Sequence, residues 1–182
     1  MSEFNNLKLE IADQTAVLSI SRPAALNALN SETLDELNTA LTEIEAMDDV
    51  KVVILTGGPD KKGNEFKSFV AGADISEMVN FTAPEARAFG IKASVPFFKL
   101  MNMRQVTIAA VNGFALCVPP NPGMIPRPHS VAKAAINNGY DMDIKNAVEM
   151  EANLFGVVND THDKKEGMGA FLEKRAANLT DF

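Results

Sequence analysis

Five prolines fall between positions 119 and 128, and no other feature of the 182-residue sequence constrains the fold as strongly. Each proline fixes its own φ angle and lacks a backbone N–H, so we expect neither a helix nor a hydrogen-bonded strand there. We interpret residues 118–128 as a stiff connector; a docking segment in polyproline II form is the alternative. The sequence therefore predicts three parts, 1–117, 118–128 and 129–182.

Residues 1–117 combine short extended runs with amphipathic helices. A turn is predicted at Asp13 and Gln14, and the last extended run is expected to be a buried strand. The extended runs lie at 7–11, 16–20, 52–55, 69–70 and 107–111. Their strand–strand–helix rhythm of forty-odd residues favours a wound ββα spiral over a flat doubly wound sheet. The predicted fold class is therefore α/β (α+β).

Helices in this part are predicted from apolar side chains at helical spacing. Ser31 is the expected N-cap of a helix that runs to about Met47. Residues 83–103 are expected to form two helical pieces that are interrupted around Val95 and Pro96.

The last third is predicted to be entirely helical. One helix covers 131–138 and ends at Gly139, a residue type typical of the position after a helix. Asp143 and Asp163 are the expected caps of two further helices.

Composition excludes some classes of function. A net charge of −7 and a pI near 4.9 disfavour general binding to nucleic acid or anionic membranes. The single cysteine, Cys117, excludes an internal disulfide and suits a reducing cytoplasm. The N-terminal residues show no secretory signal, and no apolar run is long enough to cross a bilayer. We therefore expect a cytoplasmic protein that binds neither nucleic acid nor membrane.

The residues 70–74, Val-Ala-Gly-Ala-Asp, are the strongest candidate for chemistry. Small side chains let a ligand approach the backbone, whose N–H groups can bind a phosphate or an oxyanion. A tight strand-to-helix turn explains the same residues without a ligand. His129 and His162 are expected to be solvated, and neither a metal site nor a nucleotide-binding motif is found.

Three segments, SISRPAALNALN, KSFVAGADISEM and IAAVNGFAL, occur in this order. They resemble the crotonase superfamily, in particular short-chain enoyl-CoA hydratases and bacterial 3-hydroxybutyryl-CoA dehydratases. The final third, with AINNGYDMDIKNAVEMEANLFG and DKKEGMGAFLEKR, is similar to the C-terminal helices of that family.

The resemblance implies a truncated crotonase-like spiral in 1–117 and a trimerisation-type helical segment in 129–182. It further implies a homo-oligomer, trimeric or hexameric, and reversible hydration of a short-chain 2-enoyl-CoA thioester. Coenzyme A would enter as part of that substrate, with no separate cofactor.

The family's site residues can be carried over position by position. The backbone N–H of Ala73 would be one donor of the oxyanion hole that polarises the thioester carbonyl. Ala24 stands where many relatives carry a basic residue, so one phosphate contact is expected to be weaker. Phe171 and Lys174 would reach a neighbouring subunit. The residues expected to bind coenzyme A are Ala24, Ala25, Leu26, Ala71, Asp74, Ile75, Phe171 and Lys174.

The sequence departs from the family after Leu116. There the family continues with a glycine triplet, a cysteine and a glutamate, whereas Cys117 and Val118 follow here and then the prolines. The second oxyanion donor and both catalytic glutamates have no matching residue, which indicates an internal deletion and an inactive or impaired enzyme. The deletion would also leave a sheet edge and an apolar surface uncovered. A non-catalytic acyl-CoA-binding or interaction subunit and a non-functional deletion product are the alternatives.

Overall fold

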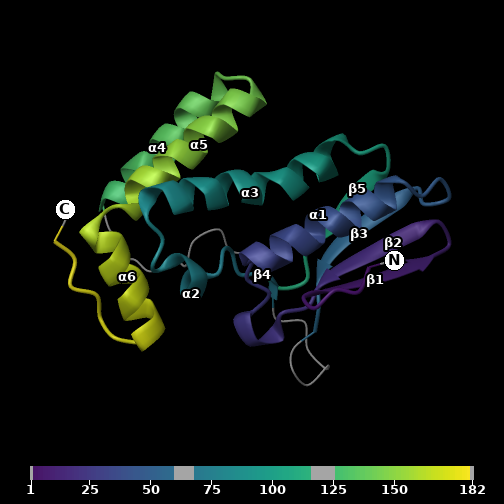
Figure 1. Ribbon diagram of the computed structural model, residues 1–182, viewed down its shortest axis with the longest axis horizontal. Helices are drawn as coiled ribbons and strands as arrows, with labels where there is room; N and C mark the ends of the chain where they lie inside the picture. Colours follow the sequence, from purple (N-terminus) through teal and green to yellow (C-terminus); the bar gives the residue numbers. More distant parts are fainter. Residues whose placement is uncertain (1, 60–67, 116–125, 181–182) are drawn as a thin grey trace. The chain divides into compact units, whose positions relative to one another are not determined.

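The computed structural model describes residues 2–59, 68–115 and 126–180 (Figure 1). Their backbone contacts divide them into two compact units. The first unit comprises 2–74 and 95–115, and the second comprises 75–94 and 126–180. The predicted boundary at 118–128 falls largely outside the described residues and stays a prediction.

A four-stranded sheet forms the base of the first unit, in the order β1-β2-β3-β5. These strands are β1 (Leu7–Ala12), β2 (Thr15–Ile20), β3 (Val52–Gly57) and β5 (Val106–Ala110). β1 and β2 form an antiparallel hairpin, whereas β2–β3 and β3–β5 are parallel pairs. Asp13 and Gln14 have φ angles of 48° and 63°, which fit the tight primed turn of a two-residue hairpin. The predicted turn is confirmed.

α1 (Ser31–Glu45) lies along this sheet and closes the core of the unit (Figure 1). Parallel pairing places Leu18 beside Leu55 on one sheet face, and both side chains are buried. The buried apolar residues of α1 are the predicted stripe Leu34, Leu37, Leu41 and Ile44, together with Ala40. A mixed sheet covered by a helix confirms the α/β class.

Two smaller elements stand near the ends of the sheet strands. A 3-10 turn, η1 (Pro23–Ala25), follows β2. A separate two-stranded parallel sheet pairs β4 (Ser68–Val70) with β6 (Phe114–Ala115). The segment KSFVAGADISEM, which contains β4, and the end of the segment IAAVNGFAL, which contains β6, are therefore neighbours.

The second unit contains only helices among its described residues. They are α2 (Ile75–Met78), the first half of α3 (Ala83–Asn102), α4 (Pro126–Tyr140), α5 (Ile144–Asn159) and α6 (His162–Glu173). α5 packs closely on α3, because a Cβ atom at Gly156 would come within 2.9 Å of the Ala83 carbonyl oxygen. No helix among the described residues is long and apolar enough to span a membrane.

Two of the predicted helix caps are wrong. Asn30 caps α1, with its side chain accepting a hydrogen bond from the Thr33 N–H, and Ser31 is the first helical residue. Thr161 caps α6 in place of Asp163. Both true caps have extended backbone angles, which the cap position requires and which sequence spacing alone does not reveal. Asp143 caps α5 as predicted.

The prolines interrupt the helices less than the sequence predicted. α3 continues from Ala83 to Asn102 with Pro96 inside it, so the predicted interruption is not found, although a proline there removes one backbone hydrogen bond. α4 begins at Pro126 and includes Pro128, so the end of the predicted connector is helical. First-turn N–H groups have no acceptor within a helix, so proline is tolerated there. Gly139 lies inside α4, next to Ala147 of α5, and does not end it.

β5 is not the buried strand that the sequence predicted. Val106 and Ile108 are 62% and 45% exposed. β5 is the last strand of the sheet, and among the described residues no strand is assigned beyond it. An apolar strand is buried only where another layer covers it, and such a layer is missing here from the described part of the chain.

Candidate active site

The loop after β2 is fixed by a buried asparagine. Leu26 and Asn27 have left-handed φ angles of 49° and 59°, a conformation in which asparagine is enriched. Asn27 is 2% exposed. Its side-chain oxygen accepts from the Arg22 backbone N–H at 2.9 Å. Its amide nitrogen donates to the carbonyls of Gly58 and Ser68, at 3.2 and 2.8 Å. Asn27 therefore ties this loop to the end of β3 and the start of β4.

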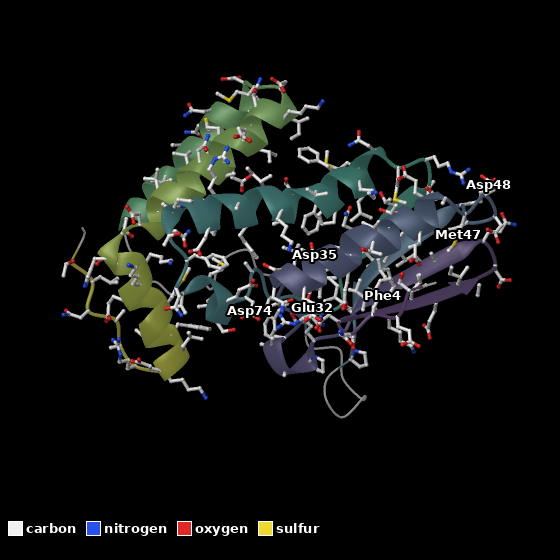
Figure 2. All side chains as sticks on the ribbon, in the orientation of Figure 1. Phe4, Glu32, Asp35, Met47, Asp48 and Asp74 are labelled. Atoms are coloured by element: carbon white, nitrogen blue, oxygen red, sulfur yellow. The ribbon has the colours of Figure 1, made fainter. Side chains whose placement is uncertain are left out.

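The loop after β4 lies directly against the loop after β2. The Ala71 N–H donates to the Leu26 carbonyl at 3.2 Å. Leu29 makes two further bonds, because its N–H donates to Gly72 O and its carbonyl accepts from Asp74 N–H, both at 2.8 Å. Figure 2 labels Asp74 at the end of this loop. The two loops form a short parallel pair that needs no side chain from elsewhere.

The peptide between Gly72 and Ala73 presents an N–H donor to which no described residue is assigned as acceptor. Gly72 has a φ angle of 92°, which a residue with a Cβ atom rarely adopts. A trans peptide is planar, so the Ala73 N–H points away from the Gly72 carbonyl and hence away from Leu29, which binds that carbonyl. Within the described residues no acceptor is assigned to the Ala73 N–H, and Ala73 is partly exposed.

Arg22 connects the two loops through its side chain. Its Nη2 lies 2.9 Å from Asp74 Oδ2, and the two side chains are only 16% and 12% exposed. Its Nη1 donates to the Ala28 carbonyl. The pKa of Glu32 is held below its usual range, first by a hydrogen bond from the Asn5 side chain and also by the charge of Arg22. The guanidinium of Arg22 thus pairs directly with Asp74, and its effect on Glu32 is the smaller one.

The residues at the end of β5 add a third side to this framework. Asn112 makes a two-bond pair with Gly57, since Oδ1 accepts from the Gly57 N–H at 3.1 Å and Nδ2 donates to the Gly57 carbonyl at 2.7 Å. The Ser68 hydroxyl donates to the Phe114 carbonyl at 3.1 Å. The predicted features at Cys117 and across 118–125 lie outside the described residues.

The first unit brings together the predicted residues of the two loops. They are Ala24, Ala25, Leu26, Ala71, Ala73 and Asp74. Ala24 and Leu26 are exposed, and the other four are half-buried. The remaining three, Ile75, Phe171 and Lys174, belong to the second unit. Phe171 is half exposed on α6, and Lys174 ends that helix with a left-handed φ of 55°. Their roles in binding stay predictions.

Sequence reasoning missed Arg22 and Asn27 as parts of the site. An arginine directly before a proline-led loop, as at Arg22, is a signal for a side chain that holds the loop. Asn27 stands between two apolar residues, where a polar side chain must find buried partners. Both signals can be found in the sequence, but neither identifies the residues that Arg22 and Asn27 bind.

Of the two histidines, the structure describes the side chain of His162 alone. His162 is exposed, as predicted, and its Nδ1 lies 3.4 Å from Asp163 Oδ1. The side chain of His129 lies outside the described residues. Among the residues that the structure describes, no group of three or more metal-binding side chains is found.

Comparisons with known proteins point to one family. A sequence profile described as enoyl-CoA hydratase/isomerase matches residues 10–118. A crotonyl-CoA hydratase of Syntrophomonas wolfei is 33% identical over 261 aligned residues, which cover 97% of this chain and 98% of the relative. A short-chain-enoyl-CoA hydratase of Clostridium acetobutylicum is 50% identical over 114 residues. That match covers 63% of this chain and 41% of the relative, so it spans less than half of that protein.

A solved structure shares the fold. The crystal structure of an enoyl-CoA hydratase from Bacillus anthracis aligns with 98% of this chain and 100% of its own, at 21% identity and a TM-score of 0.57. An identity this low shows the fold alone. The predicted α/β fold with C-terminal helices is confirmed.

Proposed function

The chain belongs to the enoyl-CoA hydratase/isomerase family of the crotonase superfamily, and we propose that it binds short-chain 2-enoyl-CoA thioesters but hydrates them poorly or not at all. The proposal divides the family's site into two halves. One half holds the thioester and polarises its carbonyl. The other half supplies the acid–base groups that add water across the double bond.

The Ala73 N–H, which has no assigned acceptor in the described part of the chain, is the observation that supports the first half. Its direction is fixed by Gly72 and Leu29, so it can meet a thioester oxygen without reorganising the loop. One such donor is typically worth about 2.7–4 kcal/mol in the transition state of acyl chemistry. Backbone donors suit this task because they are positioned before the charge develops.

The acid–base half has no counterpart in this sequence. The two family glutamates would follow the IAAVNGFAL segment, where cysteine, valine and prolines stand instead. The alignment with the Syntrophomonas wolfei enzyme extends over 261 residues, more than the 182 of this chain. This difference supports an internal deletion that removed both carboxylates and the second oxyanion donor.

The proposed path of coenzyme A follows the loop pair. Ala24, Ala25 and Leu26 would border the path of coenzyme A, and Ala71, Asp74 and Ile75 would line the adenine site. Phe171 and Lys174 of a neighbouring copy would complete the site in a trimer or a pair of trimers, within the cytoplasm. Two exposed, small or apolar residues at 24 and 26 give the ligand access to backbone polar groups.

The experiment compares binding with turnover in protein of verified intact mass. Calorimetry with crotonyl-CoA is expected to show binding, while the hydration assay gives no rate above that of buffer. Turnover at rates typical of hydratases would contradict the loss of the acid–base half. No binding at millimolar crotonyl-CoA would contradict the first half as well, and would favour the non-functional deletion product.

A further inference from the structure

Arg22 spans the loop pair at the position where the pair presents its donor. Leu29 and Ala73 face each other in a parallel bridge. Ala28, which precedes Leu29, accepts a hydrogen bond from one nitrogen of the guanidinium. Asp74, which follows Ala73, pairs with the other nitrogen at 2.9 Å. The two guanidinium nitrogens therefore hold both segments of the bridge, through Ala28 next to Leu29 and through Asp74 next to Ala73.

We propose that Arg22 is a positioning residue that fixes the orientation of the Ala73 N–H toward the thioester carbonyl. This inference rests on the proposed function, since it assigns Arg22 to the same oxyanion donor. Arg22 acts through the backbone of Ala28 and the carboxylate of Asp74, and does not touch the reacting atoms.

The geometry requires arginine at this position. The planar guanidinium offers two nitrogens in fixed directions, one for a carbonyl and one for a carboxylate, whereas a lysine ammonium is a single centre on a flexible chain. The pair is also largely shielded from water, where a hydrogen bond to a charged group is stronger than at the surface. Without the fork, the loop pair keeps its backbone bonds but loses the side-chain link between Ala28 and Asp74 that holds the orientation of the bridge.

Three variants test the inference: Arg22→Gln removes the charge, Arg22→Lys keeps the charge but not the fork, and Asp74→Asn weakens the pair. Arg104→Gln is the matched control in the same unit. Arg104 also joins a backbone carbonyl, that of Met47, to a carboxylate, that of Asp48, at 2.9 and 2.8 Å. That clamp is exposed and lies outside the loop pair.

The readout is the carbonyl of bound crotonyl-CoA. Infrared difference spectra with a ¹³C-labelled thioester carbonyl report its polarisation, and a thioether analogue without the carbonyl reports binding of the rest. For Arg22→Gln we expect a smaller frequency shift and an affinity for crotonyl-CoA that falls about three- to tenfold, the worth of one hydrogen bond. Affinity for the thioether analogue should change less than twofold, and Arg22→Lys should restore only part of the shift.

The outcomes separate this inference from the proposed function. If the parent chain polarises the carbonyl and Arg22→Gln and Arg22→Lys do so equally, the role of Arg22 is overturned while Ala73 keeps its role. If the parent chain binds crotonyl-CoA without any shift, the Ala73 donor and the inference fall together. Circular dichroism identifies variants that do not fold. If Arg22→Gln does not fold, the carbonyl shifts of Asp74→Asn and Arg22→Lys decide whether Arg22 positions the Ala73 N–H.

Discussion

The two units of this chain are held together by different means. In the first unit, large apolar side chains of the sheet and α1 are sealed from water, among them Leu18, Leu37 and Ile44, each 0% exposed. In the second unit the helices expose large apolar residues such as Ile136 and Tyr140, which are 72% and 90% exposed. An apolar core secures the first unit, while much of the apolar surface of the second remains open.

Buried polar contacts take a larger share in the second unit. Lys164, almost fully buried, donates to the carbonyls of Val79 and Phe81 at 3.2 and 2.9 Å. Asp163 accepts from the Thr180 N–H at 2.9 Å. The comparison teaches that the loop pair with the candidate site is carried by the unit whose apolar core is sealed between the sheet and α1, although β5 stays exposed there, and that the helical unit depends on a few directed bonds.

The largest expected effect is the loss of a core side chain in the first unit. Leu18→Ala should lower the free energy of unfolding by about 2–5 kcal/mol, because it removes buried contacts and leaves a cavity. Ile136→Ala in α4 removes a similar volume from an exposed site and should change the free energy of unfolding by less than about 0.5 kcal/mol. Urea denaturation measures both. Equal losses would break the contrast between the units.

A smaller loss of stability is expected when a polar side chain that supports the candidate site is removed. Asn27→Ala leaves the carbonyls of Gly58 and Ser68 without their donor and forces alanine into a left-handed conformation. It should cost about 2–3 kcal/mol. Asn27→Gly relieves the backbone strain and separates the two contributions. If both variants unfold at the parental urea concentration, the loop does not depend on this side chain.

Local features of the first unit were predictable from the sequence. The hairpin turn and the stripe of Leu34 and Leu37 depend on neighbouring residues in the chain, and the structure confirms them. The apolar pattern of β5 predicted a buried strand, because an apolar strand has the same sequence whether or not a layer covers it. The expected deletion, in contrast, predicted an uncovered sheet edge, and the exposure of Val106 and Ile108 agrees with that expectation. The caps at Asn30 and Thr161 were misplaced for a related reason, since the choice among adjacent polar residues depends on backbone angles.

The candidate site was predictable only in part. The small residues around Gly72 predicted the turn, because a left-handed φ angle favours glycine directly. The role of Ala73 as an oxyanion donor came from the family resemblance and stays a prediction. The link from Arg22 to Asp74 joins residues far apart in the chain, and it arises only when the loops after β2 and β4 come together in the fold. Sequence spacing contains no signal for such a pairing.

The directed bonds of the second unit are tested at Lys164. Lys164→Met keeps the length of the side chain but removes the donor to two carbonyls, and it should cost about 1–2 kcal/mol. Lys165→Met is the matched control, since this neighbour on α6 is exposed. Hydrogen exchange of the α6 amides should accelerate in the first variant alone. Parental protection in both variants would show that the helical unit is held by its apolar contacts.

The smallest expected effect is the loss of the contacts between Glu166 and the residues after α6 at low pH. Hydrogen bonds from the Arg175 side chain, at 2.6 and 2.9 Å, and from the Asn178 N–H lower the pKa of Glu166 to about 2. The folded pKa lies below the unfolded value of 4.5. The stabilisation is therefore complete above pH 4.5 and is lost as the pH falls toward 2.

Arg175→Gln should raise the Glu166 pKa, measured by NMR titration of its carboxyl carbon, whereas Arg104→Gln should leave it unchanged. Because Glu166 and Arg175 lie near the surface, we expect the acid to release the tail after α6 while the first unit keeps its structure. Simultaneous melting of both units would show that the tail is coupled to the apolar core, and would remove the distinction between them.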